Sequence, residues 1–276
     1  MLDALNAAVA RVTDIPRVQF VDGIGDVPAR WLEKKHANGS VHEPATLAAM
    51  LAIGEKINVT EFYDVGALYG YFTLAAQQMF PAVKITAMEM HPALKQVLHA
   101  NVNRGTHNEV ECLHVVASDV CKPLVKFWIN GFNIYEEPEG GWSELEHHPD
   151  AMRSRGANNQ GRGWARVDFA SIDAITVLTG SRPDLIKIDV EAYQQRGVMG
   201  MVETLKAYRP HVIIEVHDPI KISRLGITNK STIEPFFELG YSAYWCQNFR
   251  DMDARFEAVT EMTEAHEMLG IMVLVP

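Results

Sequence analysis

The sequence predicts an α/β fold in which a mostly parallel sheet of about seven strands carries helices on both faces. Short runs of β-branched and aromatic residues alternate with longer segments whose apolar residues recur at helical spacing. Such alternation is typical of a parallel sheet covered on both sides. The last two predicted strands have no long helix between them, so we expect an antiparallel hairpin at the sheet edge.

The length and composition indicate one sizeable globular domain. The chain has 276 residues, of which 47% are hydrophobic, too few for two full domains but enough for a large core. The formal charge of −10 argues against binding to nucleic acid or anionic lipid, because both attract basic surfaces. Cys112, Cys121 and Cys246 are odd in number and share no metal-ligand spacing, which favours a reducing cytoplasm over disulfides or zinc.

Residues 1–40 are expected to form an N-terminal helical cap, which could also serve in a homo-oligomer. Helices are predicted at 2–12 and around Trp31, with a turn at 22–28 between them. The first residues include an acid and lack the pattern of a secretory signal. No run approaches the roughly 18 apolar residues of a membrane span, so we expect no membrane association.

The elements of the main domain, at 41–276, are predicted in the following order. Pro44 suits the first turn of the first helix, and Gly54 loosens its end. The sequence predicts helices at 44–57, 71–79, 92–103, 193–208 and 232–239, strands at 59–65, 83–88, 110–116, 185–190, 211–216, 241–247 and 271–275, regular structure at 167–177, and a polar connection at 250–267.

The strand at 59–65 runs into a turn that contains Gly66 and Gly70 and then into a helix. Glycine permits positive φ and close approach of a ligand, and the start of a helix offers free N–H donors. Asp64, at the end of the strand, would repel a phosphate but suits the cationic cofactor S-adenosylmethionine. The Gly-x-x-x-Gly spacing also differs from that of nicotinamide enzymes. An ordinary strand-to-helix turn is the alternative.

Polar residues follow the next two predicted strands. Glu89 ends the second strand, where an acid in a βαβ nucleotide fold accepts hydrogen bonds from ribose hydroxyls. Ser118 and Asp119 follow the third strand and could meet an adenine, with Asp119 accepting from the exocyclic amine. In both places the alternative is a polar loop in contact with solvent.

Residues 121–165 interrupt the alternation of strands and helices. Glycines are interleaved there with aromatic residues such as Trp128 and Trp142, and His147 and His148 form a pair that could equally lie on the surface. A loop of this length is usually functional or disordered. We therefore expect a substrate lid or insertion.

Three runs of residues carry a resemblance to a known family. They are Asp64-Val-Gly-Ala-Leu-Tyr-Gly-Tyr-Phe-Thr73, Ala87-Met-Glu-Met-His-Pro92 and Pro183-Asp-Leu-Ile-Lys-Ile-Asp-Val-Glu191. With Ile213-Ile-Glu-Val-His217, they make residues 42–217 similar to the FkbM family of S-adenosylmethionine-dependent methyltransferases. The chain departs from the family pattern at three positions, where Leu68 replaces the usual Asn, Met90 the usual Pro and Ala192 the usual Gly.

The resemblance implies a class I methyltransferase (Rossmann-like) fold and O-methylation of a hydroxyl on a sugar or natural product, with S-adenosylhomocysteine as the second product. Glu43 matches an acid that the family often carries before its first helix, and it would lie near the amino-acid end of the cofactor or serve only as a helix cap or solvated acid. The residues expected to bind the cofactor are Glu43, Asp64, Gly66, Ala67, Tyr69, Gly70, Tyr71, Glu89, Ser118 and Asp119.

The reaction centre is expected at the ends of the strands at 185–190 and 211–216, because ligands bind beyond the carboxyl ends of parallel strands. Asp189, Glu191 and His217 would line it beside Lys187, with His217 as the base because its ordinary pKa lies near neutrality. Alternatively, Lys187, Asp189 and Glu191 form a partly buried ion-pair network and His217 caps the strand end. A third possibility is that Asp189, Glu215 and His217 hold Mg²⁺ or Mn²⁺. They match no metal motif, so no metal ligand is predicted.

Two other functions compete with methyl transfer to a small hydroxylated acceptor. One is an NAD-dependent oxidoreductase, and the other is a cofactor-binding protein without turnover. Methylation of nucleic acid is disfavoured by the net charge.

Overall fold

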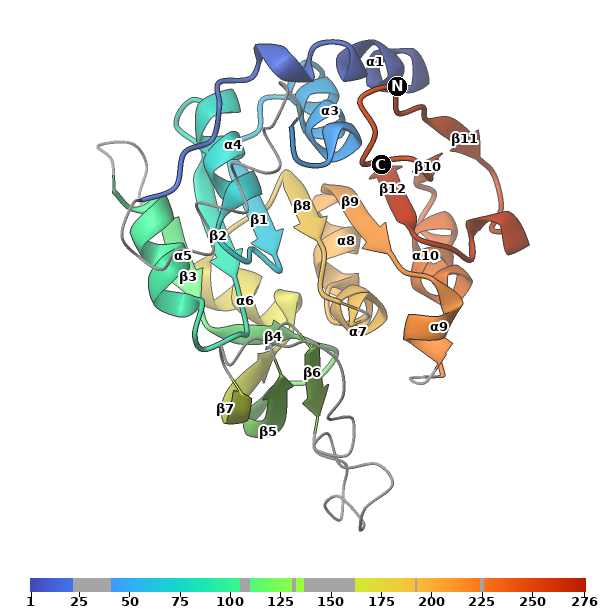
Figure 1. The fold of residues 1–276 in the computed structure, drawn as a ribbon. Helices are drawn as coiled ribbons and strands as arrows, with labels where there is room; N and C mark the ends of the chain where they lie inside the picture. The colour runs from blue at the N-terminus through green and yellow to red at the C-terminus, as the bar shows by residue number, and fades with distance from the viewer. Residues whose placement is uncertain (22–40, 105–109, 131–132, 137–161, 192, 224–225) are drawn as a thin grey trace.

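The computed structural model describes residues 1–21, 41–104, 110–130, 133–136, 162–191, 193–223 and 226–276 (Figure 1). Within these residues the chain forms a large sheet of eight strands and a small sheet of four. No helix in the described ranges is long and apolar enough to cross a membrane. The helix predicted around Trp31 lies outside the described residues.

The large sheet has the strand order β11-β10-β12-β9-β8-β1-β2-β3. Its parallel strands are β1 (Glu61–Val65), β2 (Lys84–Met88), β3 (Val110–Leu113), β8 (Leu185–Ile188) and β9 (His211–Val216). The antiparallel pairings involve β10 (Ser242–Cys246), β11 (Glu257–Val259) and β12 (Gly270–Val275). The predicted α/β fold with a mostly parallel sheet is therefore confirmed.

Two details of the predicted sheet were wrong. The predicted hairpin exists as β10 and β12, but β12 pairs with β9 on its other side and so lies inside the sheet. The edge strand is β11, which comes from the segment that the sequence suggested was a polar connection. A short edge strand with exposed polar residues lacks the apolar alternation by which buried strands are identified.

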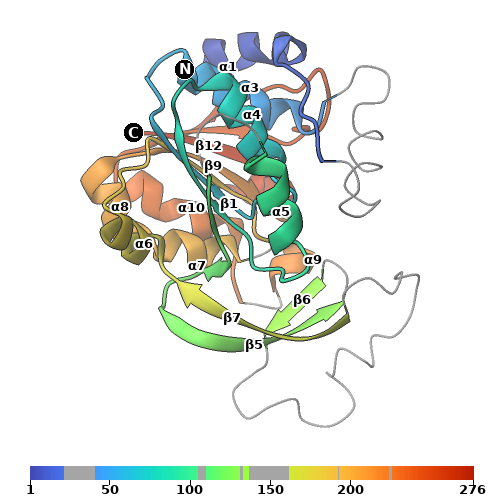
Figure 2. The ribbon, with the colours of Figure 1, turned by 90° about the vertical axis from the view of Figure 1, so that its left-hand side faces the viewer.

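The large sheet lies between two layers of helices (Figure 2), and alternate residues of its central strands pack against opposite layers. Phe62 and Leu185 pack in one apolar core, whereas their neighbours Tyr63 and Ile186 pack in another. The first layer contains α1 (Leu2–Val9), α3 (Pro44–Gly54), α4 (Tyr71–Met79) and α5 (Lys95–Val102), and the second contains α6 (Ile172–Thr179), α7 (Gln194–Met199), α8 (Val202–Tyr208) and α10 (Asn229–Glu238). Burial of each such side chain contributes about 1.5–3 kcal/mol, so both layers hold the strand ends in place.

The helix predicted at 193–208 is divided into α7 and α8 at Gly200. A Cβ atom at Gly200 would collide with the backbone carbonyl of Ser118. The helix therefore breaks where a distant loop touches its backbone, which is a tertiary contact that helical spacing does not reveal. By contrast, α6 begins at Ser171, whose hydroxyl accepts from the N–H of Ala174 at 3.1 Å.

The small sheet has the order β4-β7-β5-β6 and lies beside the carboxyl ends of the large sheet (Figure 2). It comprises β4 (Val115–Ala117), β5 (Lys122–Asn130), β6 (Asn133–Glu136) and β7 (Arg162–Ala170). The alternation of strands and helices is interrupted here as predicted, but the interpretation of 121–165 as one long loop was wrong for the described part of that segment, which forms strands. Val125 and Phe127 are buried at alternate positions of β5, but the nearby glycines obscured this alternation. Trp142, His147 and His148 lie outside the described residues.

The strand predicted at 110–116 is in fact two strands in two sheets. β3 pairs with β2 in the large sheet, whereas β4 pairs with β7 in the small one. The chain changes sheets at His114, whose Nδ1–H donates to the carbonyl of Glu89 at 2.9 Å. The small sheet is thereby fixed next to the end of β2.

The N-terminal segment packs on the main domain. The predicted helix at 2–12 ends earlier, at Val9, and a short 3₁₀ helix η1 (Val12–Asp14) follows it. Leu5 and Ala8 are buried against α3 within the first apolar core. The Asn6 side chain also exchanges two hydrogen bonds with the backbone of Phe256, at 2.8 and 3.1 Å.

Candidate active site

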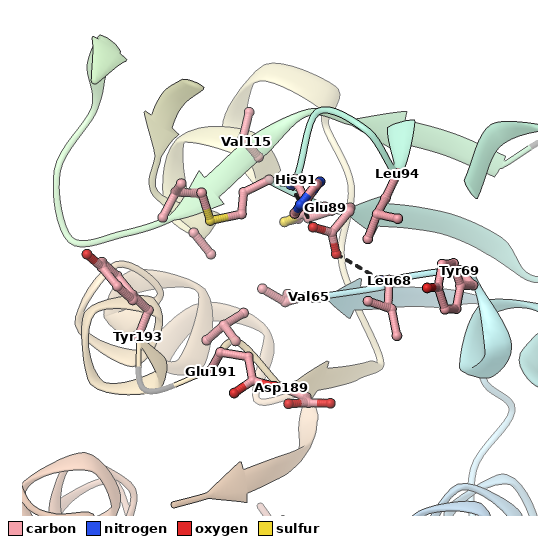
Figure 3. Close-up of a pocket in the computed structure, with 16 residues that line it drawn as sticks. Val65, Leu68, Tyr69, Glu89, His91, Leu94, Val115, Asp189, Glu191 and Tyr193 are labelled. Carbon is pink, nitrogen blue, oxygen red and sulfur yellow. Dashed lines mark hydrogen bonds between the residues drawn. The ribbon is translucent and has the colours of Figure 1, made fainter. Parts of the chain in front are cut away.

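A cavity of about 300 Å³ lies at the carboxyl ends of β1, β2 and β8 (Figure 3). Ligands bind at this end of the strands in open α/β sheets. Figure 3 shows Glu89 and His91 on one side of the cavity and Asp189 and Glu191 on the other. Among the described residues that line the cavity, three are carboxylates and none is Lys or Arg.

The loop after β1 forms the floor of the cavity in a fixed conformation. Gly66 has a φ of +82°, and a Cβ atom there would collide with the carbonyl oxygen of Asp189. The N–H groups of Gly66 and Ala67 both donate to the carbonyl of Met88, at 2.9 and 3.0 Å. The turn is thus tied to the end of β2 and touches the end of β8.

Leu68 also has a left-handed backbone, with a φ of 52°. This region disfavours most side chains, whereas Asn tolerates it. The N–H of Leu68 donates to Oε2 of Glu89 at 2.9 Å. A backbone hydrogen bond therefore holds the loop at the position where the resembling family usually has Asn.

Glu89 is buried and presents both carboxylate oxygens at the cavity. Oε2 accepts from Leu68, and Oε1 accepts from the N–H of His91 at 2.7 Å. Burial raises the pKa of Glu89 above its usual value, although these two backbone donors act in the opposite direction. A carboxylate has about four acceptor sites, so Glu89 can also accept hydrogen bonds from a bound ligand.

Asp64 does not line the cavity. Its side chain is fully buried behind the loop, where Oδ2 accepts from the Thr73 hydroxyl at 2.7 Å and Oδ1 lies 3.4 Å from Nζ of Lys187. Lys187 also donates to the carbonyl of Gly66 at 3.2 Å and lies 3.5 Å from Asp189. Asp64 and Lys187 together connect β1 and β8 to the loop that contains Gly66.

Lys187 remains protonated in this environment. Burial alone would lower its pKa, but the surrounding carboxylates, Asp64 first among them, raise the pKa above its ordinary value. A lysine that keeps its proton at neutral pH cannot accept one from a substrate. Its ammonium instead stabilises the buried carboxylates and fixes the loop.

A second acidic region lies at the ends of β8 and β9. One ligand-type atom from each of Asp189, Glu215 and His217 lies within 4.8 Å of the other two. Nε2 of His217 is 3.6 Å from Glu191 and 3.8 Å from Glu215. Burial lowers the pKa of His217, although Asp189 acts in the opposite direction. The imidazole is therefore neutral near pH 7.

Two further groups complete this region. Glu43 is buried before α3 and accepts from the Thr46 hydroxyl at 3.1 Å, and burial followed by the charge of Asp189 raises its pKa to about 7. Arg250 lies 3.3 Å from Glu215 and 3.9 Å from Glu43. Burial also raises the pKa of Glu215. These groups adjoin the reaction centre predicted from the sequence.

The remaining predicted residues occupy other places. Ser118 donates to Asp119 at 3.0 Å, and Asp119 pairs with Arg196 at 2.9 Å, so neither side chain lines the cavity. Gly70 begins α4 with a φ of 88°. Tyr71 lines a second cavity of about 260 Å³ between η1 and α4. Of the cofactor-binding residues predicted from the sequence, Gly66, Tyr69 and Glu89 line the main cavity.

Sequence reasoning missed the apolar wall of the main cavity. This wall comprises Met88, Met90, Leu94, Val115, Val116, Ala117, Val190 and Tyr193. The only signal for them in the sequence is their position just before or after the carboxyl end of a predicted strand. Tyr193 is fixed from behind, because its hydroxyl donates to Glu136 of β6 at 3.2 Å and Glu136 also pairs with Arg196 at 3.1 Å.

The doubly wound sheet and the cavity at its strand ends define a Rossmann-like α/β protein. The family model described as the Methyltransferase FkbM domain matches residues 64–256. The chain belongs to this family. In a comparison with curated proteins, no match to the chain was found.

Solved structures of methyltransferases resemble the chain at low sequence identity. The FkbM methyltransferase from Methylobacillus flagellatus KT has a TM-score of 0.45 and 10% identity, over 97% of this chain and 58% of that chain. The O-methyltransferase from Bacillus cereus, in complex with SAH, has a TM-score of 0.44 and 13% identity, over 100% of both chains. The TehB-like SAM-dependent methyltransferase from Corynebacterium glutamicum ATCC 13032 Kitasato has a TM-score of 0.43 and 10% identity, over 90% of this chain and 95% of that chain.

Proposed function

We propose that this protein transfers the methyl group of S-adenosylmethionine to a hydroxyl oxygen of a small molecule, such as a sugar or another hydroxylated natural product. The observation that carries the proposal is the placement of Glu89, a buried carboxylate at the end of β2 whose two oxygens face the cavity. An acid at this place in a βαβ fold accepts from ribose hydroxyls. Membership of the FkbM methyltransferase family supports the type of reaction.

The charge of the cavity favours a cationic cofactor over a dinucleotide. Glu89, Asp189 and Glu191 line it, and no Lys or Arg among its described lining residues would neutralise a pyrophosphate. The sulfonium and ammonium groups of S-adenosylmethionine suit such a site. This observation disfavours the NAD-dependent alternative.

The reaction needs alignment more than covalent participation of the protein. The bond between sulfur and the methyl carbon breaks as the acceptor oxygen forms its bond to that carbon, and the sulfur keeps the electron pair. The acceptor hydroxyl gives its proton to a neighbouring base or to water. Holding the two reactants in line accounts for much of the acceleration in such reactions, and the rigid loop at Gly66 provides a fixed support for the cofactor.

The acceptor would lie toward the ends of β8 and β9. Asp189 and Glu191 line the cavity on that side, and His217 is 3.6 Å from Glu191. From the sequence, His217 could serve as the proton acceptor or as the ligand of a cation. Because burial lowers the pKa of His217, its imidazole is neutral near pH 7, and an unprotonated ring nitrogen can either accept a proton or bind a cation.

Calorimetry with S-adenosylmethionine, S-adenosylhomocysteine and NADH tests the cofactor. We expect binding of the first two and none of NADH; binding of NADH alone would refute the proposal. The acceptor class is tested by incubating the protein with methyl-labelled cofactor and a panel of hydroxylated sugars and natural products, followed by mass spectrometry. Tight binding of S-adenosylhomocysteine with no labelled product from any acceptor would favour the cofactor-binding protein without turnover.

A further inference from the structure

We propose that Asp189, Glu215 and His217 bind a divalent cation such as Mn²⁺ at the acceptor side of the cavity. The three residues come from adjacent parallel strands. Lys187 and Ile188 of β8 pair with Ile213 and Ile214 of β9, so the chain places Asp189 and Glu215 side by side just beyond. Because side chains alternate along a strand, His217 projects from the same face as Glu215.

The spacing of the three ligand atoms fits a shared ion. They lie within 4.8 Å of one another. Around a six-coordinate ion with bonds of about 2.1–2.4 Å, neighbouring ligand atoms are about 3 Å apart and opposite ones about 4.2–4.8 Å apart. The observed arrangement therefore admits an ion with only small movements of the side chains.

The histidine ring provides a second observation. His217 is 2% exposed, and its Nδ1 has no hydrogen-bond partner in the described part of the chain. Nε2 points at the carboxylates of Glu191 and Glu215 at 3.6 and 3.8 Å, beyond the distance of a hydrogen bond. A buried imidazole is expensive to leave unpaired. A cation between Nε2 and these carboxylates would give Nε2 a partner, and the ring proton would then reside on Nδ1.

The balance of charge points the same way. If every group is counted as ionised, the five carboxylates in the ion pairs of this region outnumber the three cationic side chains by two among the described residues, an excess that one divalent cation would offset. The carboxylates are Glu43, Asp64, Asp189, Glu191 and Glu215, and the cations are Lys187, Lys221 and Arg250. Buried carboxylates without compensation are strongly unfavourable.

The type of ligand indicates the type of ion. Carboxylates suit Mg²⁺, Ca²⁺ and Mn²⁺, while imidazole suits transition metals. A set of two carboxylates and one imidazole therefore favours Mn²⁺ over Mg²⁺. A monovalent ammonium group would supply half of the missing charge and would not need an imidazole.

The cation deepens the proposed function, on which its role rests. Three protein ligands would leave positions open for the oxygen of an acceptor hydroxyl, and a bound cation would stabilise the anion formed when that hydroxyl gives its proton to the neighbouring carboxylate of Glu191 or to water. In this arrangement His217 is a ligand rather than the base predicted from the sequence, because Nε2 has one lone pair. Asp189, one of the three ligands, lines the main cavity together with the adjoining Glu191, so the site borders the space in which an acceptor would bind.

Binding of Mn²⁺ alone tests the inference. Protein treated with a chelator and then dialysed is titrated with Mn²⁺, and the free ion is measured by electron paramagnetic resonance. We expect one saturable site per chain, with affinity at least tenfold weaker in Glu215→Gln and in His217→Gln. Glu203→Gln changes an exposed carboxylate on α8 and should bind Mn²⁺ as the unaltered protein does.

Binding of S-adenosylhomocysteine shows that each variant is folded, because neither Glu215 nor His217 lines the main cavity. Absence of a saturable Mn²⁺ site, or equal affinity in both ligand variants that bind S-adenosylhomocysteine, overturns the inference. Methyl transfer that resists chelation, by protein that does not bind Mn²⁺, overturns the cation while leaving the proposed function. Saturable Mn²⁺ binding by protein that does not bind S-adenosylmethionine would support the cation site and overturn the proposed function.

Discussion

Nζ of Lys187 lies 3.4 Å from the carboxylate of Asp64, and both side chains are withdrawn from solvent in the centre of the sheet. The same ammonium donates to the carbonyl of Gly66. One buried ion pair thus connects the neighbouring strands β1 and β8 to the loop that forms the floor of the cavity. Removal of either partner would leave a buried charge uncompensated.

Lys187→Met should destabilise the protein by about 3–5 kcal/mol, the usual cost when one partner of a buried pair is removed. Urea unfolding of the ligand-free protein measures this change. The double variant Asp64→Asn with Lys187→Met should recover part of the loss, because it removes the most deeply buried of the carboxylates that Lys187 compensates, while Asp189 still lacks its partner. Lys206→Met breaks an exposed pair with Glu203 and should change stability by less than about 1 kcal/mol. If Lys187→Met and Lys206→Met lost similar amounts of stability, the role given to Lys187 would be contradicted.

Gly66→Ala should abolish binding of S-adenosylhomocysteine or prevent folding, because a Cβ atom would collide with the carbonyl of Asp189. Gly180→Ala is the matched control. Gly180 also has a positive φ, of 66°, but has no atom within 4 Å of the added carbon. The control should therefore lose only about 1–2 kcal/mol from backbone strain and should keep its ligand affinity. Thermal unfolding and calorimetry compare the two, and equal effects would show that the contact with Asp189 is unimportant.

Glu89→Ala should weaken binding of S-adenosylhomocysteine by about 1.5–3 kcal/mol, the range for hydrogen bonds to a charged group, or roughly 10- to 150-fold. The change also removes the acceptor of the N–H groups of Leu68 and His91, so the loop should become less ordered. Calorimetric titration measures the affinity. Glu111→Ala, on the exposed side of β3, serves as the control. If both variants bind equally well, Glu89 does not contact the ribose.

Glu43→Gln should stabilise the ligand-free protein at high pH. The pKa of Glu43 is raised from 4.5 to about 7 by burial and by Asp189, so the folded state holds a proton that the unfolded state releases. The stability that this proton contributes is fully present below pH 4.5 and is lost as the pH rises to about 7. The variant should therefore match the original protein at pH 4.5 and exceed it by up to about 3 kcal/mol at pH 8. Urea unfolding across this range, in the presence of chelator, would contradict the assignment if the difference did not grow with pH.

The parts of the fold that sequence patterns predicted well are those in which local pattern and tertiary environment agree. The helix predicted at 71–79 and the strand predicted at 211–216 have the predicted bounds in the structure. Both are apolar at the spacing of their element. The breaks at Gly200 and His114 depend on contacts with residues far away in the chain, so local pattern cannot reveal them.

Residues of the candidate site could be predicted from the sequence where the end of a strand could be predicted. Glu89 and Asp189 follow well-defined strands, and both line the cavity. Asp64 also ends a strand, but its side chain points between β1 and α4 toward Thr73 and Lys187. Which side of a strand meets the ligand depends on how the helices pack, and no residue type in the sequence encodes that directly.

The change of sheets at His114 has a further consequence. The residue that joins the large sheet to the small one also donates to the backbone of Glu89, and β4, which follows it, lines the cavity. The apolar wall that β4 contributes and the end of β2 that carries Glu89 are therefore held together through one side chain, so that replacement of His114 would disturb both sides of the cavity at once.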